Sequence, residues 1–176
     1  MSIEDVSRRL EAVTSVFDAH EIPYALVGGQ AVAIWVATVD PEAVRTTKDV
    51  DILLRRADLP QARSAAQSIG MDYFETMGVG MLLARENPNP RSAVHLVWSG
   101  ELVRPGELAP APTVEQQELV DAKWKVASLP ALVTMKLTAW RDQDRVHLRD
   151  LRDVGLIDED VVRHLPAELA ERWRSL

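Results

Sequence analysis

The segment from Lys48 to Leu54 reads KDVDILL, an apolar β-strand pattern that contains two aspartates. Because side chains alternate along a strand, Asp49 and Asp51 leave the same face and Val50 leaves the other. Two carboxylates this close repel each other, and burial adds a desolvation cost. A fold that contains this strand must therefore offset two negative charges on one face.

A divalent cation would remove both the repulsion and the desolvation cost. Mg²⁺ prefers hard oxygen ligands, usually takes one or two carboxylates, and fills its shell with water and phosphate. The alternative is an edge strand whose aspartates face water and pair with Arg45 or Lys48. Because a D-x-D pattern often occurs without a metal site, this motif alone leaves both interpretations open.

The composition limits the classes of protein to consider. The chain has 176 residues, of which 47% are hydrophobic and 27% charged, enough for one compact globular domain. It has no cysteine, which excludes disulfides and thiol ligands and fits a reducing cytosol. The N-terminus is acidic and no apolar run is long enough to span a bilayer, so we expect a cytoplasmic protein without a membrane partner. With a net charge of -7, a polyanionic partner would need a local basic patch or metal ions.

Hydrophobic periodicity predicts the order α-β-α-β-α-β-β-β followed by helices, which is typical of an α/β or α+β fold with a C-terminal helical region. Ser2 and Asp5 form a capping box ahead of the first helix. The segment 99–113 is rich in Pro and Gly, so we expect residues 1–113 to form an α/β core and 114–176 to form a mainly helical region packed on it. The expected strands cover 24–27, 48–54, 71–75, 79–85 and 92–98, and the later expected helices cover 30–38, 59–69, 129–141 and 144–155.

Gly28 and Gly29 lie between the first expected strand and the helix that follows it. Glycines there let the backbone approach a phosphate closely, and a helix N-terminus offers free amides and a favourable dipole. The alternative is a tight turn that needs a positive φ. The defining residues of a dinucleotide-binding fingerprint and of a P-loop are both missing.

Taken together, YALVGGQAVAIW and RTTKDVDILL resemble the core of the nucleotidyltransferase-fold superfamily, in which a Gly-Gly or Gly-Ser turn precedes D-x-D on the next strand. The form Arg45-x-Thr47-x-Asp49-x-Asp51 is similar to the AbiEii-type abortive-infection toxins and their bacterial relatives. The later segment SLPALVTMKLTAWRDQDRVHLRDL resembles their lysine-bearing helix and Arg/Asp-rich segment. The resemblance covers roughly residues 20–155 and implies a nucleotidyltransferase-like mixed sheet flanked by helices.

The resemblance implies a catalytic role for Asp49 and Asp51 as ligands of Mg²⁺ or Mn²⁺. An acceptor hydroxyl would attack the α-phosphate of an NTP, pyrophosphate would leave, and metal ions would hold the attacking and leaving oxygens in line. The acceptor could be RNA, a protein or a small molecule, and a toxin-like protein implies an antitoxin partner. The second interpretation is a non-catalytic module of the same fold that binds a nucleotide or a partner protein. The resemblance assigns nucleotide binding to Gly28, Gly29, Thr47 and Lys136.

One position departs from the family pattern. Members of the superfamily usually supply a third carboxylate from a later central strand, but here that strand reads SAVHLVWSG and presents His95. An imidazole suits Mn²⁺ or Zn²⁺ better than Mg²⁺, and it can also act as a general base. The alternative is a structural histidine within the sheet, so a catalytic role for His95 stays open at this stage.

The C-terminal helices offer further candidates. On a helical wheel from Leu132 through Arg152, apolar side chains share one face, and Lys136 borders it. We expect the Lys136 stem to be buried while its ammonium reaches toward a site. Another side carries arginines beside aspartates, which indicates either local ion pairs in solvent or an arginine track for triphosphate or RNA. His147 is expected to be part of this polar surface. The arginines are Arg141, Arg145, Arg149 and Arg152.

Overall fold

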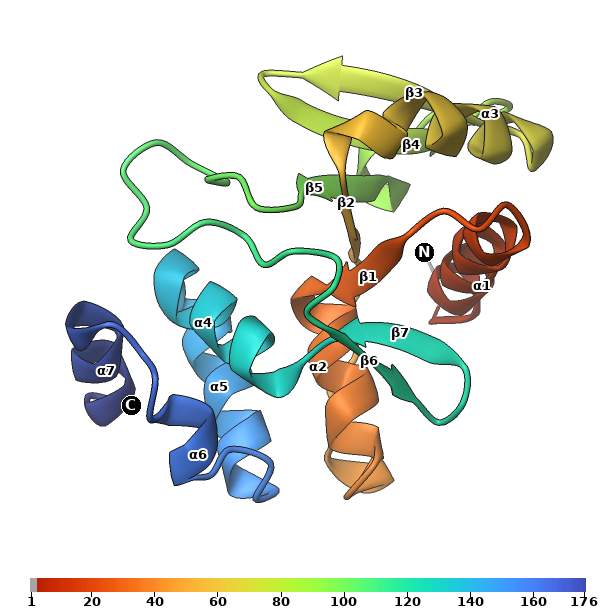
Figure 1. Cartoon of the computed structure of the whole chain (residues 1–176). Helices are drawn as coiled ribbons and strands as arrows, with labels where there is room; N and C mark the ends of the chain where they lie inside the picture. Colours follow the sequence, from red (N-terminus) through yellow and green to blue (C-terminus); the bar gives the residue numbers. More distant parts are fainter. Residues whose placement is uncertain (1–2) are drawn as a thin grey trace.

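The computed structural model describes residues 3–176, and a seven-stranded sheet forms its centre (Figure 1). The predicted cap at Ser2 lies outside the described residues. The strands are β1 (Tyr24–Val27), β2 (Val50–Leu54), β3 (Met71–Thr76), β4 (Val79–Ala84), β5 (Val94–Trp98), β6 (Gln117–Val120) and β7 (Trp124–Ala127). The helices are α1 (Ile3–Ala19), α2 (Gly28–Ala37), α3 (Leu59–Ser68), α4 (Leu129–Ala139), α5 (Asp142–Asp153), α6 (Glu159–Val162) and α7 (Ala167–Arg174), with short 3-10 turns at Pro41–Ala43, Arg56–Asp58 and Pro90–Ser92.

The sheet is mixed, with the order β3-β4-β5-β2-β1-β7-β6. Strand β2 runs antiparallel to β1 and parallel to β5, and β1 runs parallel to β7. Beyond Asp51, strand β2 is apolar and buried, because Ile52, Leu53 and Leu54 have no exposed surface. The predicted class, an α/β mixed sheet flanked by helices with a C-terminal helical region, is confirmed.

The helices flank the sheet in two groups. Helix α2 starts directly after β1 and contacts both α4 and α5, and Figure 1 shows these three helices close together. Helices α1 and α3 contact each other, and α3 also packs against the edge strand β3. Within residues 3–176, no helix combines the length and apolar character that crossing a bilayer requires.

The hairpin of β6 and β7 was not predicted. Three residues, 121–123, join the two strands, and the first two of them, Asp121 and Ala122, both have positive φ values (52° and 53°). A turn of this kind normally carries Asn-Gly or Asp-Gly, so an alanine at the second position removes the sequence signal. The boundary at residue 113 stays a prediction, although β6 and β7, which follow it, lie in the same sheet as the strands before it.

Two other details differ from the sequence-based expectations. Strand β2 begins at Val50, the first residue paired with β5, so Asp49 lies in the preceding loop rather than in the strand. The single helical wheel is wrong as well, because Trp140 adopts a left-handed conformation (φ 52°) that ends α4 and turns the chain into α5.

Candidate active site

Asp51 is the second residue of β2, between β1 and β5. It lies opposite Val27 on β1 and beside His95 on β5. Its side chain is 25% exposed, and Asp49 lies just before the strand with an exposed side chain. Burial raises the pKa of Asp51, opposed by the charges of His95 and Lys136, and the charge of Asp49 raises it further. The chain thus holds a poorly solvated carboxylate next to a second one, as expected for a cation site.

The glycine turn joins β1 to α2 directly beneath these carboxylates. Gly28 has a φ of +70°, and a Cβ there would collide with the Asp51 carboxylate. A Cβ on Gly29 would lie 2.7 Å from Oγ1 of Thr47. The N-cap residue of α2, Val27, has no capping side-chain hydrogen bond, so the first amides of the helix are available to an anion.

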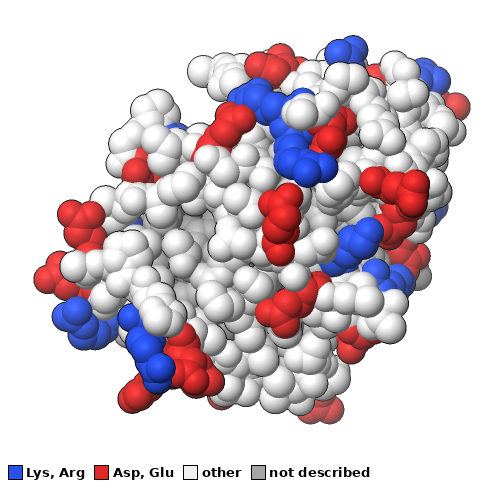
Figure 2. Space-filling view, in the orientation of Figure 1, with Lys and Arg blue, Asp and Glu red and all other residues white. Residues whose placement is uncertain are grey.

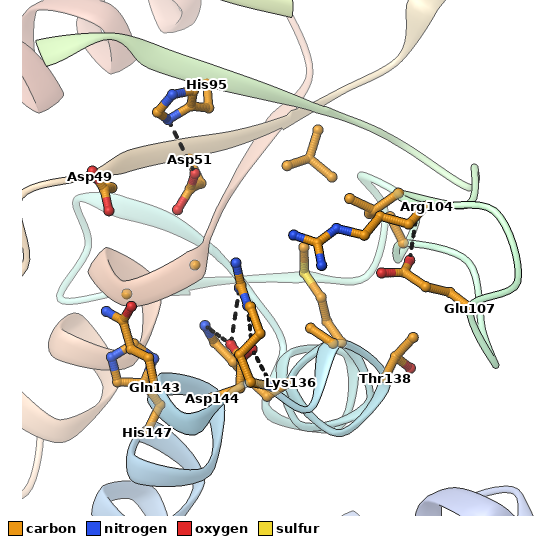
Figure 3. A pocket seen from close by; sticks show the side chains of 18 of the residues that line it. Asp49, Asp51, His95, Arg104, Glu107, Lys136, Thr138, Gln143, Asp144 and His147 are labelled. Atoms are coloured by element: carbon orange, nitrogen blue, oxygen red, sulfur yellow. Dashed lines mark hydrogen bonds and ion pairs between the residues drawn. The ribbon is translucent and has the colours of Figure 1, made fainter. Parts of the chain in front are cut away.

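A cation-carboxylate cluster, buried at Lys136 and Asp144 and exposed at Arg141, faces the glycine turn from α4 and α5 (Figure 3). Lys136 is only 4% exposed, and its Nζ donates to Oδ1 of Asp144 at 3.0 Å. Nε of Arg141 donates to Oδ2 of Asp144 at 2.7 Å. Burial alone would raise the pKa of Asp144, but the hydrogen bond from Arg141 and the charge of Lys136 keep it below its usual value. Lys136 is therefore a buried group that lines the cavity, with its ammonium paired to Asp144.

Asp144 was not predicted as a site residue. It is the third residue of α5 and accepts from the backbone N–H of Arg141 at 3.2 Å, which is the N3 half of a capping box, since the Arg141 side chain has no acceptor for the other half. Arginine is not a usual N-cap residue, so the S/T-x-x-E/Q signature of this motif is absent. The usable signal was the three-residue spacing between Arg141 and Asp144.

Two of the three other arginines of the proposed track form the local ion pairs that one interpretation predicts. Arg145 pairs with Asp142 and Arg152 with Asp153. Arg149 instead donates to the carbonyl of Leu176, at 3.5 Å.

His95 faces the same side of the sheet as Asp51. Its Nδ1 lies 3.7 Å from Oδ1 of Asp51, and its side chain is 32% exposed. This is the position from which the superfamily pattern expects a third carboxylate. The strand register thus places His95 beside Asp51, as the sequence analysis expected. The catalytic role of His95 stays a prediction.

These groups surround one cavity of about 300 Å³ (Figure 3). Part of its wall comes from the loop 99–113 that follows β5, where Glu107 accepts from the backbone N–H of Arg104 at 3.2 Å. The residues to which the sequence analysis gave a catalytic, metal-binding or nucleotide-binding role all line this cavity, namely Gly28, Gly29, Thr47, Asp49, Asp51, His95 and Lys136. Lining residues that the sequence did not nominate as binding or catalytic groups include Arg104, Glu107, Gln143, Asp144 and His147.

His147 is a correction, because it was expected on the polar surface. It is only 7% exposed and lies on the inner side of α5. Burial lowers its pKa to about 4, with a further lowering from the charge of Lys136. The sequence signal was its place one residue before the buried Leu148, although a polar side chain there also fits a helix border.

The carboxylates fit a hard divalent cation. Asp49 and Asp51 both line the cavity, and two carboxylates with water and phosphate are a usual ligand set for Mg²⁺. Among the described side chains, no group of three or more His, Asp or Glu residues is arranged as a metal cluster. The donor set therefore consists of two carboxylates, with His95 beside one of them.

A profile of the family described as "Nucleotidyl transferase AbiEii toxin, Type IV TA system" matches residues 10–174. This chain belongs to that family. A comparison with curated proteins gives no significant match.

Among the solved structures, several share the fold of this chain. The solution structure of the antibiotic-resistance factor ANT(2'')-Ia is 12% identical with a TM-score of 0.60, over 97% of this chain and 93% of that one. The crystal structure of ANT(2'')-Ia with adenylyl-2''-tobramycin is 12% identical with a TM-score of 0.59, over 96% of both chains. An antigenic nucleotidyltransferase-like protein from Paracoccidioides brasiliensis is 14% identical with a TM-score of 0.62, over 98% of this chain and 87% of that one. At these identities, the similarity concerns the fold.

Proposed function

We propose that this protein transfers a nucleoside monophosphate from an NTP to an acceptor hydroxyl, in a reaction that requires Mg²⁺ or Mn²⁺. One observation carries the proposal. Two carboxylates, a glycine turn at a helix N-terminus and a buried lysine line the same cavity, although they come from distant parts of the chain. This combination suits an anionic ligand that arrives with a divalent cation.

Each group has a role that follows from its position. The amides at Gly28 and Gly29 bind phosphate oxygens, and the Thr47 hydroxyl adjoins the same turn. Lys136 and Arg141 supply positive charge toward the departing pyrophosphate, and their shared partner Asp144 fixes their geometry. Asp49 and Asp51 would hold the cation, which when bound neutralises charge on phosphate oxygens.

The proposed reaction is a single displacement at the α-phosphorus. The acceptor oxygen forms a bond to this atom, the bond to the β-phosphate oxygen breaks, and pyrophosphate leaves. The hydroxyl proton passes to a ring nitrogen of His95, which lies beside Asp51 and is partly exposed.

The acceptor is proposed to be RNA or a protein. The cavity of about 300 Å³ is at the lower end of small-ligand pockets, which supports one nucleotide inside and an acceptor that enters from the rim. The toxin description of the family supports a macromolecular acceptor and an antitoxin partner. On the face shown in Figure 2, described basic side chains lie among acidic ones, so this face gives RNA no added support. A small molecule is the alternative, because the ANT(2'')-Ia complex contains adenylylated tobramycin. We place the reaction in the cytoplasm, which fits a chain without cysteine.

The second candidate function is a nucleotide-binding module without catalysis. The observation that favours it is His95, at the position beside Asp51 where a third carboxylate is expected. Such a module would bind an NTP with Mg²⁺ and release it unchanged. His95→Asp would then complete the carboxylate set and create measurable transfer.

The test is transfer of label from each of four α-³²P NTPs, with Mg²⁺ or Mn²⁺ and with RNA, protein or small-molecule extracts as acceptors. We expect label in one acceptor class and a loss of at least about a hundredfold in Asp49→Asn and in Asp51→Asn. The matched control is Asp153→Asn at the exposed end of α5, which should keep full activity. Metal-dependent binding without transfer would support the non-catalytic module, and neither binding nor transfer would contradict both functions.

A further inference from the structure

His147 is the buried group of the cavity to which the proposed reaction gives no role. It lies on α5, which packs against α2. Its Cε1 is 3.4 Å from the position that a Cβ on Gly29 would occupy, so the imidazole edge lies against the glycine turn. Figure 3 shows its ring beside Gln143 on the α5 side of the cavity.

The ring has a buried atom without a partner. Among the described residues, Nδ1 of His147 is fully buried and has no hydrogen bond. A buried polar atom without a partner is unfavourable, and a ligand in the cavity cannot reach Nδ1, so contact with a ligand is left to the other ring nitrogen, Nε2. A neutral imidazole has one acceptor and one donor nitrogen. If Nδ1 is the acceptor, the N–H is on Nε2 and is free to donate to a ligand.

The surroundings of the ring carry charges of both signs. Lys136 on α4 and Arg141 at the start of α5 lower the pKa of His147, in addition to burial, whereas Asp144 and Asp150 on α5 raise it. The glycine turn of α2 contributes no ionisable side chain. The ring is therefore neutral near pH 7, and an added negative charge would favour its protonated form.

We propose that His147 is a phosphate ligand of the bound nucleotide, whose ring N–H donates to a phosphate oxygen held at the Gly28–Gly29 turn and takes up a proton on binding. This inference rests on the proposed nucleotide site and adds a residue and a proton-linked binding step to it. The cavity-lining position of His147 and its contact with the glycine turn point to it.

Proton uptake sets the sign of the pH dependence. In the free protein the ring protonates only near pH 4, because its pKa is lowered to about 4. Phosphate oxygens beside the ring stabilise the cation and raise this pKa in the complex. Affinity should therefore increase as the pH falls through the pKa of the complex. If that value returns to the ordinary histidine value of about 6.5, affinity increases about tenfold between pH 8 and pH 5.5.

The test compares the full chain with His147→Gln by titration calorimetry at both pH values, in buffers of different ionisation enthalpy. The probes are inorganic tripolyphosphate and α,β-methylene-ATP, each with Mg²⁺. Phosphate protonation affects both proteins equally. The proposal therefore predicts that affinity increases about tenfold more between pH 8 and pH 5.5 in wild type than in His147→Gln, and that only wild type takes up an additional proton. The control is His164→Gln, an exposed histidine, which should behave as wild type.

A second measurement avoids the variant altogether. The pKa of His147, followed by NMR in the wild-type protein, should rise when tripolyphosphate binds. Equal pH dependence in wild type and His147→Gln, or an unchanged histidine pKa in the complex, would overturn the proposal while labelled transfer and binding still support the proposed function. Failure of every NTP to bind wild type would instead contradict the proposed function.

Discussion

At the scale of single residues, Asp144 has no exposed surface and accepts hydrogen bonds from both Lys136 and Arg141. Removing one partner of a buried ion pair leaves an uncompensated charge, which costs about 3–5 kcal/mol. We expect Asp144→Asn to lose a similar amount in urea unfolding, because Lys136 cannot reach water easily. The control Asp142→Asn, with a side chain 92% exposed, should change stability by less than about 0.5 kcal/mol.

A double variant tests the explanation. Lys136→Met removes the buried charge that Asp144→Asn leaves unpaired, so the double variant should be more stable than Asp144→Asn alone. If the double variant is no more stable than the single one, the loss does not come from the unpaired lysine.

His147 gives a pH-dependent prediction for stability. Burial lowers its pKa to about 4, below the value of about 6.5 in an unfolded chain. Between these values only the unfolded chain binds the proton, so the free energy of unfolding falls as pH falls. We expect this group to remove roughly 2 kcal/mol between pH 7 and pH 4.5. Urea unfolding at both pH values should show a smaller loss in His147→Gln, and His164→Gln should follow wild type. Equal losses in all three proteins would contradict this assignment.

Single residues also show what the sequence could predict of the site. The short-range patterns Gly28-Gly29 and Asp49-x-Asp51 pointed to residues that line one cavity, because backbone freedom and close spacing act over a few residues, although Asp49 lies before β2. Asp144 and His147 were not nominated, because their burial depends on how α5 packs against α2 and α4. Sequence spacing within a helix does not show which partner will cover a polar face.

At the scale of elements, local sequence patterns again predicted some features, while features without a local signal were missed. Strands β3 and β4 were predicted to within about a residue at each end, because apolar runs with a Met-Gly turn between them are a local signal. The hairpin of β6 and β7 was missed because Asp121-Ala122 is an unusual turn sequence. The break between α4 and α5 was expected at residues 142–143 but lies at residues 140–141, because Trp140 is a non-glycine residue with positive φ, which gives no sequence signal.

The loop before β2 carries Thr47 and Asp49 and forms hydrogen bonds with two helices, α2 and α5. Nε of Arg45 donates to both carboxylate oxygens of Asp150 on α5, at 3.0 and 2.7 Å. The Gln30 side chain on α2 donates to the carbonyl of Thr47 at 3.3 Å. These contacts join the loop to α2, which begins with Gly28 and Gly29, and to α5, which carries His147.

We therefore expect Arg45→Ala to affect binding more than folding. The Arg45 side chain is 64% exposed, so stability should change by less than about 1 kcal/mol. Nucleotide affinity with Mg²⁺ should fall about tenfold, because a displaced loop weakens contacts worth about 1 kcal/mol each. Calorimetry measures the affinity and urea unfolding the stability. The control Arg8→Ala, which removes an exposed ion pair on α1, should leave affinity unchanged.

The charge swap Arg45→Asp with Asp150→Arg can re-form the ion pair with reversed sign. Recovery of affinity in the swap would support a positioning role for the pair. A swap as weak as Arg45→Ala would show that the loop does not depend on this contact.

At the scale of the whole molecule, the cavity lies where distant parts of the chain meet. It takes residues from the turn after β1, from β2 and β5, from the loop 99–113, and from α4 and α5 (Figure 3). The net charge of -7 opposes a polyanionic ligand, so binding depends on the local cations and on a divalent metal. A nucleotide in this cavity would connect the sheet with the C-terminal helices.

Such a ligand should stabilise the whole fold. Binding to the native state alone adds about 2.7 kcal/mol at a ligand concentration of 100 times Kd. For a chain of this size, this corresponds to a rise in Tm of about 5–10 °C. We expect this shift with Mg²⁺ or Mn²⁺ and the preferred NTP together, and a much smaller one with either alone. The Asp49→Asn, Asp51→Asn double variant should lose the shift. Without ligand it should be at least as stable as wild type, because burial already raises the pKa of Asp51 and the repulsion with Asp49 is gone. Differential scanning fluorimetry measures all these values, and a full ligand-induced shift in the double variant would exclude these carboxylates as the metal ligands.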